Sequence, residues 1–398
     1  MIRKKIVICG GHLTPALALI EEIEKKKNIE IIFFGRKIAT EGSSNYSAEY
    51  RIISAKKIKF FTLVAGRIQR KFTKYTLTSL VKIPIGFIQS FLYLLLLRPN
   101  LIVSFGGYLS TPVIFCGWLL GIESITHEQA IIPGFATKAN SLFVKKVFVS
   151  WKETAKFFDS RKVEVVGNLV RQSIFQKHPK SPKIAEFLKR SKNLIFIAGG
   201  NQGSHFLNNL IFHSLDLFKE YFLLHQVGTA NFKGDYQRAQ EIKNKNYMSC
   251  DYIDPDDFGA IASKAKAVIC RSGANTVWEL ALLSKPAILI PLPLSSGNEQ
   301  LENARILERA GFAKVSSQSK LSTKELTSKI KDIFNNYKNY RKKAHTFSKI
   351  LQKDANFKVS AYIDHLLGYS ERENPGIYAG GENESREAKE ENTTAFRQ

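Results

Sequence analysis

The sequence predicts an α/β protein with two Rossmann-like, doubly wound domains. One observation is size: 398 residues, 44% of them hydrophobic, exceed one ordinary core and suffice for two. Another is a unit of apolar strand, glycine turn and amphipathic helix, which occurs early and begins again near Asn193. A third is the stretch 267–313, where strand, tight turn, helix, strand, loop and helix follow one another.

The first unit begins at the N-terminus. Lys4 to Cys9 is a predicted strand, and a turn at 10–12 leads into a helix that we expect Thr14 to cap, with Pro15 at its first position. A glycine turn that feeds a helix is a natural seat for a diphosphate, because free N–H groups and the helix dipole both face the anion. His12 in this turn is a candidate general base, although a lone histidine is more often structural.

The same design recurs further along the first half. A predicted strand at 101–105 is followed by Gly106, Gly107 and Tyr108, and then by a helix that opens at Ser110 or Thr111. A later strand ends in His127 and Glu128. These two side chains are candidates for the site, but structural hydrogen bonding is the interpretation that we favour.

The stretch 56–99 has a different character, because aromatic and aliphatic side chains alternate with lysines and arginines. Its part 84–97 is apolar throughout, which is shorter than the roughly 20 residues that span a bilayer. We expect its inner face to be a buried helix. The basic, aromatic part beside it favours contact with an anionic membrane surface.

The second half begins with a strand at 193–197 and a turn at 199–203, which is the most glycine-rich turn of the chain and a good phosphate cradle. Further on, Ser272 and Gly273 end another strand, and we expect Asn275 to cap the next helix. Glu279 in that helix can accept hydrogen bonds from both hydroxyls of a ribose. The helix dipole alone would also favour an acidic residue there.

Two amides and three carboxylates complete the list of polar candidates. Gln300 and Asn303 share one helix face and offer the donors and acceptors that a hexose needs, although such a pair is most often solvated. Asp254, Asp256 and Asp257 suggest a metal site at first sight. Helix capping around Pro255 explains these carboxylates more simply, so we expect no metal.

The formal charge of +24, from 59 basic and 35 acidic residues, favours an anionic partner: nucleic acid, a membrane face or a phosphorylated substrate. No nucleic-acid-binding signature accompanies the charge, so nucleic acid is not expected. Four scattered cysteines suit a reducing cytosol, and the early strand at the N-terminus argues against secretion. Residues 369–398 are rich in Glu, Gly and Asn, and we expect them to be disordered.

Eight short motifs stand in the order typical of one enzyme family. The motifs are GGHxxPxxA at 10–18, FGGYLSTP at 105–112, HEQ with PG at 127–134, GNxVR at 167–171, GGxQG at 199–203 with Asn208, HQxG at 225–228, SGAxTxxE at 272–279 and QxxNA at 300–304. With these motifs, the chain from about residue 4 to 365 resembles the MurG family of N-acetylglucosaminyltransferases.

This resemblance implies the GT-B architecture, in which two Rossmann-like domains face a cleft. The N-terminal domain, 1–168, would face acceptor and membrane, and the C-terminal domain, 169–345, would bind the UDP-sugar. A helix at 346–368 would pack back on the N-terminal domain, before the tail 369–398. The implied reaction is inverting transfer of N-acetylglucosamine from UDP-GlcNAc to the 4-hydroxyl of the muramyl sugar of lipid I, forming lipid II. It would need no metal or other cofactor and would take place at the cytoplasmic face of the plasma membrane, with the enzyme bound peripherally.

The resemblance also assigns residues. His12 would be the catalytic base, with Glu128 as a weaker candidate. The acceptor or its diphosphate would meet Gly10, Gly11, Gly106, Gly107 and Tyr108. Ile253 would pack at the uracil, Glu279 would hold the ribose, and Gln300 with Asn303 would hold the sugar. The full implied donor set is Arg171, Asn201, Gln202, Gly203, Ile253, Ala274, Asn275, Thr276, Glu279, Gln300 and Asn303.

Three positions depart from the family pattern. The first glycine turn is two residues shorter, Ala130 stands where an Asn normally follows HEQ, and Asn201 replaces a Ser. A missing hydrogen-bonding residue can change discrimination by orders of magnitude. Two alternatives therefore stay open: a transferase of the same fold that acts on another lipid acceptor, and a catalytically weakened relative that binds a UDP-sugar.

Overall fold

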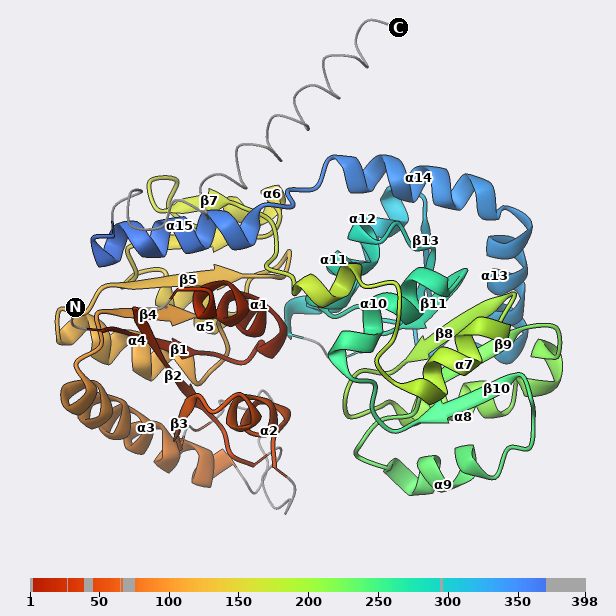
Figure 1. Ribbon diagram of the computed structural model, residues 1–398, viewed down its shortest axis with the longest axis horizontal. Helices are drawn as coiled ribbons and strands as arrows, with labels where there is room; N and C mark the ends of the chain where they lie inside the picture. The colour runs from red at the N-terminus through yellow and green to blue at the C-terminus, as the bar shows by residue number, and fades with distance from the viewer. Residues whose placement is uncertain are drawn as a thin grey trace, which may run out of the picture. The chain divides into compact units, whose positions relative to one another are not determined.

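The computed structural model describes residues 3–26, 28–38, 46–64, 66, 76–293 and 296–369. The chain forms two compact units (Figure 1). Unit 1 holds the residues up to Gln129, then Pro133–Arg171, and the chain from Gln352 onward. Unit 2 holds Gln172–Leu351 together with the short segment Ala130–Ile132.

Unit 1 is built on a seven-stranded parallel sheet with the order β3-β2-β1-β4-β5-β6-β7. The strand order reverses between β1 and β4, and ligands of doubly wound sheets bind at such a switch point. The strands are β1 (Lys4–Cys9), β2 (Ile29–Gly35), β3 (Lys59–Thr62), β4 (Leu101–Ser104), β5 (Ser124–Glu128), β6 (Lys146–Val149) and β7 (Val163–Val165).

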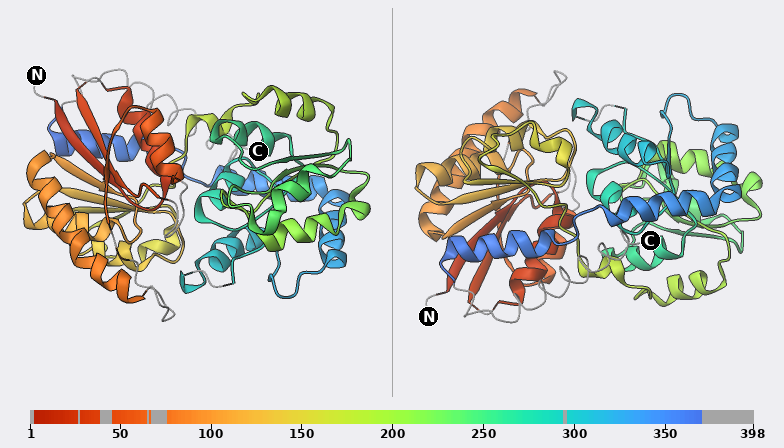
Figure 2. Two further views of the ribbon diagram at one scale, coloured as in Figure 1. Left: turned by 90° about the horizontal axis from the view of Figure 1, so that it is seen from below. Right: turned by 90° about the horizontal axis from the view of Figure 1, so that it is seen from above.

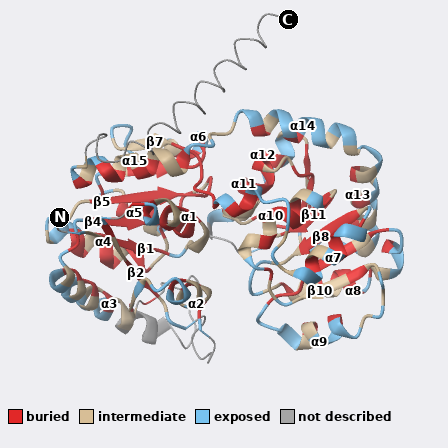
Figure 3. Ribbon diagram, in the orientation of Figure 1, coloured by how far each residue is buried: buried red, intermediate tan, exposed pale blue. Residues whose placement is uncertain are grey.

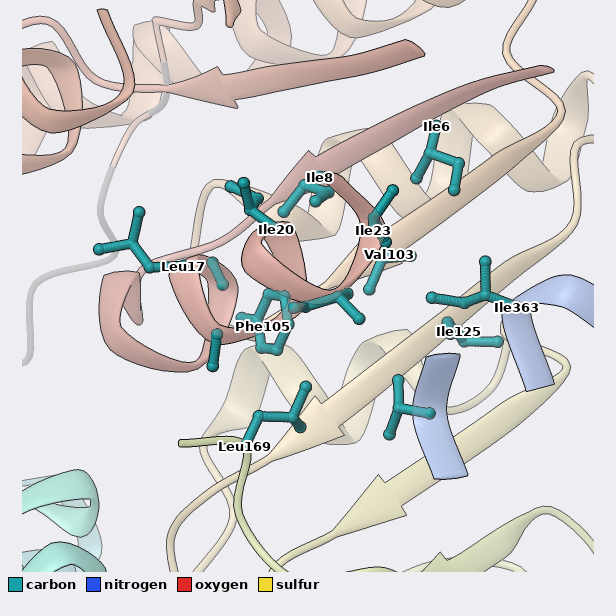
Figure 4. Packing of buried hydrophobic residues seen from close by; sticks show 14 of the residues in the cluster. Ile6, Ile8, Leu17, Ile20, Ile23, Val103, Phe105, Ile125, Leu169 and Ile363 are labelled. Atoms are coloured by element: carbon teal, nitrogen blue, oxygen red, sulfur yellow. The ribbon is translucent and has the colours of Figure 1, made fainter. Parts of the chain in front are cut away.

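Helices cover both faces of this sheet (Figure 2). Side chains alternate along β1, so Ile6 and Ile8 pack on one cluster, shown in Figure 4, and Val7 and Cys9 on another. The first cluster includes residues of α1 (Leu13–Glu24), α2 (Ala48–Ala55) and α15 (Ala355–Leu367). The second includes residues of α3 (Thr76–Leu97) and α4 (Ser110–Leu119). Two short helices, α5 (Phe135–Asn140) and α6 (Lys152–Ala155), complete the unit.

The last helix, α15, is tied to unit 1 by polar bonds as well as by packing. The Lys26 ammonium, almost fully buried, lies 2.6 Å from the Asp364 carboxylate and donates to the Ser360 hydroxyl at 2.6 Å. The amide of Asn356 pairs with the backbone of Val170, accepting from its N–H at 3.1 Å and donating to its carbonyl at 2.7 Å. The C-terminal helix is therefore part of the core of unit 1.

Unit 2 is a six-stranded parallel sheet with the order β10-β9-β8-β11-β12-β13, the order of a dinucleotide-binding Rossmann fold. Its switch point lies between β8 and β11. The predicted fold class, two Rossmann-like doubly wound domains, is confirmed. The strands are β8 (Leu194–Ala198), β9 (Phe222–Gln226), β10 (Tyr247–Cys250), β11 (Ala267–Cys270), β12 (Ala287–Leu289) and β13 (Ala313–Val315).

The sheet of unit 2 is also buried between helices (Figure 3). Ile195 and Ile197 of β8 pack against α8 and α13, whereas the ring of Phe196 on the opposite face meets Phe258 of α10. The helices are α7 (Pro182–Arg190), α8 (His205–Phe212), α9 (Asp235–Gln240), α10 (Pro255–Lys264), α11 (Ala274–Leu282), α12 (Glu299–Arg309), α13 (Thr323–Asn335) and α14 (Tyr337–Lys349), with single 3-10 turns at Gln172–Phe175, Leu215–Phe218, Phe232–Gly234 and Ser296–Asn298.

Three expected helix starts can be compared with the structure. Asp254 caps α10 by accepting from the N–H of Asp256, so the capping interpretation is confirmed for Asp254, while Asp256 and Asp257 lie in the first turn of the helix. The expected cap at Thr14 is wrong, because α1 begins at Leu13 and His12 is its N-cap residue. The expected cap at Asn275 is also wrong, because Gly273 precedes the first residue of α11. Neither His12 nor Gly273 uses a side chain for capping, so neither start carries the usual signal.

Candidate functional site

The two glycine turns of unit 1 lock into each other at the switch point between β1 and β4. Gly11 donates to the Gly106 carbonyl at 3.0 Å. A Cβ on Gly10 (φ +136°) would lie 2.8 Å from that same oxygen, and one on Gly107 (φ +76°) would lie 2.9 Å from the Gly11 nitrogen. Only glycine fits at such an approach with positive φ. The two predicted diphosphate seats therefore form one continuous surface.

Buried side chains support this surface from below. Ser104 accepts from the Gly106 N–H at 3.1 Å, and the Ser110 hydroxyl donates to the Gly107 carbonyl at 2.8 Å. Asn140 of α5 is 1% exposed and donates to the Ser110 hydroxyl at 2.7 Å. The sequence analysis missed Asn140, because its partners lie 30 residues or more away along the chain.

Two histidines lie beside these turns. Burial lowers the pKa of His12, so its imidazole is neutral near pH 7 and can accept a proton. His127 is fully buried, and its Nε2 donates to the Gly167 carbonyl at 2.9 Å while its Nδ1 accepts from Gln129 at 3.0 Å. Burial lowers the pKa of His127 to about 4. With both ring nitrogens bonded inside the protein, His127 has the structural role that we favoured.

Two further predicted residues lie at the carboxyl edge of the same sheet. Glu128 is 3% exposed, and its carboxylate accepts from the Gly134 N–H at 3.2 Å, so it braces the loop that follows β5. Tyr108 follows the second glycine turn, and the guanidinium of Arg36, directly after β2, lies 5.8 Å from its ring centre. Arg36 brings to this edge a cation that the sequence analysis did not consider.

In unit 2, the turn 199–203 after β8 is held by the segment that follows β9. The N–H groups of Thr229 and Ala230 donate to the carbonyls of Asn201 and Gln202 at 3.0 and 3.2 Å. Gly203 has a φ of +87°, and a Cβ there would lie 2.0 Å from the Val227 oxygen. The backbone of this predicted phosphate cradle is therefore fixed, while the side chains of Asn201 and Gln202 stay exposed.

The second turn of unit 2 follows β11 on the other side of the switch point. Ala274, Asn275 and Thr276 form the first turn of α11, so their backbone lies at a helix N-terminus. Glu279 lies in the next turn and is 7% exposed. The two turns that the resemblance assigns to the donor thus flank one switch point, and this juxtaposition agrees with nucleotide binding in such sheets.

Helix α12 carries the two predicted sugar ligands. Gln300 is partly exposed, and its amide oxygen accepts from the Leu292 N–H at 3.0 Å. Asn303 is fully buried, and its amide accepts from the Ile131 N–H at 3.1 Å and donates to the Ser272 carbonyl at 3.3 Å. In this structure Asn303 therefore joins three backbone segments of unit 2. Its contact with a sugar stays a prediction.

Arg271 is the functional candidate that sequence analysis missed. It follows β11 directly and is partly buried, and burial lowers the pKa of its guanidinium. It donates to the Ser204 hydroxyl at 2.7 Å, to Gln318 at 2.8 Å and to the Ile290 carbonyl at 3.1 Å. These three partners are neutral acceptors, and its guanidinium brings a positive charge to the switch point. An arginine at a strand end before a glycine turn was the available signal.

The other predicted residues are buried. Arg171, which ends the segment Pro133–Arg171 of unit 1, is 8% exposed, and Ile253, which follows β10 in unit 2, is 4% exposed. Across the described ranges, no group of three or more His, Cys, Asp or Glu side chains is placed to hold a metal ion.

Comparisons with known proteins agree with this architecture. Residues 9–149 match the glycosyltransferase family 28 N-terminal domain, and residues 194–360 match the glycosyltransferase family 28 C-terminal domain. The UDP-N-acetylglucosamine–N-acetylmuramyl-(pentapeptide) pyrophosphoryl-undecaprenol N-acetylglucosamine transferase of Treponema denticola is 33% identical over 321 residues, which are 77% of this chain and 81% of that protein. The protein of the same name from Clostridium kluyveri is 32% identical over 337 residues, 83% and 91% of the two chains.

Solved structures share the fold. The crystal structure of Acinetobacter baumannii MurG has a TM-score of 0.64 at 21% identity and covers 91% of this chain and 99% of its own. Staphylococcus aureus MnaA in complex with UDP has a TM-score of 0.66 at 16% identity, with 92% and 98% covered. The two matched family domains, the named relatives and the fold together define a glycosyltransferase of the GT-B class. Within that class, the chain belongs to the MurG family.

Proposed function

We propose that this enzyme transfers N-acetylglucosamine from UDP-GlcNAc to the 4-hydroxyl of the muramyl sugar of lipid I, with inversion, and so forms lipid II. The observation that carries the proposal is the identity of about one third, over most of both chains, with relatives that are named for this reaction. The paired glycine turns at both switch points support it, because donor and acceptor each contain a diphosphate.

In this proposal, unit 2 binds the donor. Glu279 accepts hydrogen bonds from the ribose hydroxyls, and the turn 199–203 and the N-terminus of α11 present N–H groups to the diphosphate. The same N–H groups stabilise the charge that develops on departing UDP. Gln300 and Asn303 would orient the sugar, Ile253 would pack on the uracil, and Arg171 would complete the donor set.

Unit 1 would bind the acceptor on the interlocked turns around Gly11 and Gly107. His12 would take the proton of the attacking hydroxyl, because its lowered pKa keeps the imidazole neutral at pH 7. Glu128 is a weaker candidate for this role, since its carboxylate already braces the Gly134 loop.

The first experiment measures UDP release from UDP-GlcNAc and a lipid I analogue. We expect turnover by the natural protein, and roughly a 10- to 100-fold rise in the KM for UDP-GlcNAc in Glu279→Ala, because a charged acceptor is lost. Glu241→Ala, at an exposed position of the same unit, is the matched control and should leave the KM unchanged. An unaltered KM in Glu279→Ala would exclude Glu279 from ribose binding.

We further propose that unit 1 binds an anionic membrane surface at the cytoplasmic face of the plasma membrane. Along the outer face of α3, apolar side chains are solvent-exposed at helical spacing: Ile88, Leu92, Leu95 and Leu96, with exposed fractions of 60%, 55%, 47% and 76%. Such a stripe beside basic residues is typical of peripheral contact. Of the neighbouring basic aromatic stretch, residues 67–75 lie outside the described residues. No helix in the described ranges is both long and apolar enough to cross a bilayer.

Cosedimentation with anionic liposomes tests the membrane proposal. The double variant Leu92→Glu with Leu96→Glu should bind liposomes at least about tenfold more weakly, because each buried side chain contributes roughly 1.5–3 kcal/mol. Its turnover of a water-soluble acceptor should not change. Ile350→Glu replaces an apolar side chain of unit 2 with 74% exposure and serves as control. Equal binding by both variants would contradict the proposal.

One observation keeps the second candidate function open. Ala130, which stands where the family pattern has Asn, is 3% exposed and has no polar side chain that could bond to a sugar. A weakened relative, or an enzyme for another lipid acceptor, would bind UDP in calorimetry without turning over the lipid I analogue. The variant Ala130→Asn should then raise turnover.

The positive charge does not need nucleic acid as its partner, and liposome binding should exceed any salt-sensitive binding of DNA or RNA.

A further inference from the structure

A chain of buried hydrogen bonds runs behind the glycine turn of unit 2. His225 of β9 is fully buried, and its Nδ1 accepts from the Tyr247 hydroxyl at 3.0 Å. Its Nε2 donates to the side-chain oxygen of Asn208 at 3.0 Å. The amide nitrogen of Asn208 donates onward to the Val227 carbonyl at 3.0 Å and to the Asp235 carboxylate at 2.8 Å. The chain therefore links three elements, β9, β10 and α8, to the start of α9.

From Tyr247 onward, each group of this network donates a hydrogen bond in the direction of Asp235. Burial lowers the pKa of His225 to about 3, so the ring is neutral at pH 7 and carries one proton. That proton must lie on Nε2, because Nδ1 accepts from Tyr247 and Asn208 offers an oxygen. Each group thus donates toward Asp235, whose carboxylate is the end of the chain. Such a fully satisfied buried network holds one side-chain arrangement.

Asp235 joins this network to the glycine turn itself. Its side chain is 2% exposed, and the Nδ1 of His205 donates to its two oxygens at 2.9 and 3.0 Å. His205 is the first residue of α8 and directly follows Ser204, the residue that closes the turn. Asp235 is therefore bonded to the helix that begins where the turn ends.

The backbone between Gly228 and Asp235, here called the strap, is fixed at both of its ends. At one end the N–H groups of Thr229 and Ala230 hold the carbonyls of the turn, and at the other end Asp235 holds His205. Between these ends Asn231 and Lys233 have φ values of 45° and 52°. Non-glycine residues are strained in this left-handed region. The strap keeps this conformation because its ends are held.

The strap decides where the turn points its N–H groups. A trans peptide places its carbonyl and its N–H on opposite sides. Because the Asn201 carbonyl points to Thr229 in the strap, the N–H of Gln202 in the same peptide points away from the strap. The strap thus fixes the orientation of the turn that would bind the donor diphosphate, and Asp235 fixes the conformation of the strap.

We propose that Asp235 is a positioning residue for donor binding: through His205 and Asn208 it holds the strap, and the strap orients the turn 199–203 toward the diphosphate of the sugar nucleotide. Asp235 does not itself touch the donor. This inference rests on the proposed function of the turn. It also accounts for two motif elements, Asn208 and His225, to which the sequence analysis assigned no role.

Steady-state kinetics with UDP-GlcNAc and a lipid I analogue test the proposal. Asp235→Ala should raise the KM for UDP-GlcNAc about tenfold or more, and leave kcat and the acceptor KM within about twofold. Asp235→Asn keeps an acceptor for His205 and Asn208, and should restore the KM to within about threefold of the natural value. His205→Ala, at a partly exposed position, should raise the KM in the same direction without unfolding the protein.

Asp332→Ala is the matched control in the same unit. Asp332 also has several partners, Lys314 at 2.7 Å, the Tyr340 hydroxyl at 2.7 Å and the Asn336 amide at 2.9 Å, but it lies on α13 and contacts neither the turn nor the strap through them. It should lower stability without changing the KM. An unchanged KM in Asp235→Ala, or an equal rise in Asp332→Ala, would overturn the positioning role.

Calorimetric titration with UDP separates this inference from the proposed function. If the natural protein binds UDP without turning over lipid I, the proposed reaction fails, whereas weaker UDP binding by Asp235→Ala still supports the positioning role. Equal UDP affinity of the natural protein and Asp235→Ala overturns that role even if turnover is observed. A natural protein that binds no UDP overturns both.

Discussion

At the scale of single residues, Gly200 and Gly203 offer a matched pair. Their φ values are +89° and +87°, so an alanine would be strained equally at both positions. Their surroundings differ: a Cβ on Gly200 would meet nothing within 4 Å, whereas one on Gly203 would lie 2.0 Å from the Val227 oxygen. Gly200→Ala should cost about 1–2 kcal/mol of unfolding free energy.

Gly203→Ala should cost roughly 2 kcal/mol more than Gly200→Ala, because the backbone at Val227 must move as well. Urea unfolding of the two variants measures the difference. The UDP affinity of Gly203→Ala should also fall, because a shift of Val227 moves the adjacent strap, whose Thr229 and Ala230 bond to the turn. Equal stability of the two variants would show that the backbone at Val227 can move away from the new Cβ without lowering the unfolding free energy.

Arg271 supplies a second test at this scale. A lysine can replace its charge but not its planar set of donors to Ser204, Gln318 and Ile290. Arg271→Lys should therefore raise the KM for UDP-GlcNAc by roughly tenfold, as expected for the loss of one or two charged hydrogen bonds. Steady-state kinetics check this, with the exposed helix residue Arg305 as the control for Arg→Lys. Identical kinetics of both variants would show that only the positive charge of Arg271, and not its planar set of donors, affects the KM.

At the scale of elements, the buried pair between α15 and Lys26 can be tested by unfolding. Lys26→Ala leaves the Asp364 carboxylate buried without its cation and should cost about 3–5 kcal/mol. Lys26→Met combined with Asp364→Leu removes both charges and should recover most of that loss. Lys25→Ala breaks only an exposed pair with Glu22 and should change stability by about 0.5 kcal/mol or less. A Lys26→Ala variant as stable as Lys25→Ala would contradict this account.

The sequence patterns predicted the helices, strands and turns better than they predicted the contacts between these elements. Apolar strands, glycine turns and helix stripes follow local rules of periodicity and backbone freedom, so the strands at Lys4–Cys9 and the turn at 199–203 were predictable. The starts of α1 and α11 were not, because His12 and Gly273 make no side-chain capping bond. Contacts such as Lys26 with Asp364, or Asn303 with Ile131, join residues far apart in sequence and follow only from the fold.

At the scale of the whole molecule, His127 in unit 1 and His225 in unit 2 are both fully buried and neutral at pH 7. Burial lowers the pKa of His127 to about 4 in unit 1 and that of His225 to about 3 in unit 2. An unfolded histidine titrates near 6.5, so between that pH and the lowered values the unfolded chain binds more protons. The stability that these two histidines contribute is therefore fully present above about pH 6.5 and is lost as the pH falls toward their lowered pKa values.

Between pH 7 and pH 5 each of these two histidines should lower the unfolding free energy of its unit by about 2 kcal/mol. The reason is that the unfolded chain binds one more proton below pH 6.5, which changes the unfolding free energy by about 1.4 kcal/mol per pH unit. Hydrogen exchange of β5 and β9 in a urea series measures the two units separately. His127→Gln should reduce the pH dependence of unit 1, to which the lowered pKa of His12 also contributes, and should leave unit 2 unchanged. His225→Gln should reduce the pH dependence of unit 2 and leave unit 1 unchanged. Equal protection of both strands at pH 7 and pH 5 would refute the assignment.

The return of α15 to unit 1 has a consequence for biosynthesis. Ala355, Val359, Ile363 and Leu367 belong to the same core as β1 and α1, although the ribosome adds them more than 300 residues later. The first-made unit therefore exposes part of its interior until α15 has been synthesised, while most of the second unit is already available to fold. A ribosome that stalls before codon 355 would release a chain whose earlier half is the immature one.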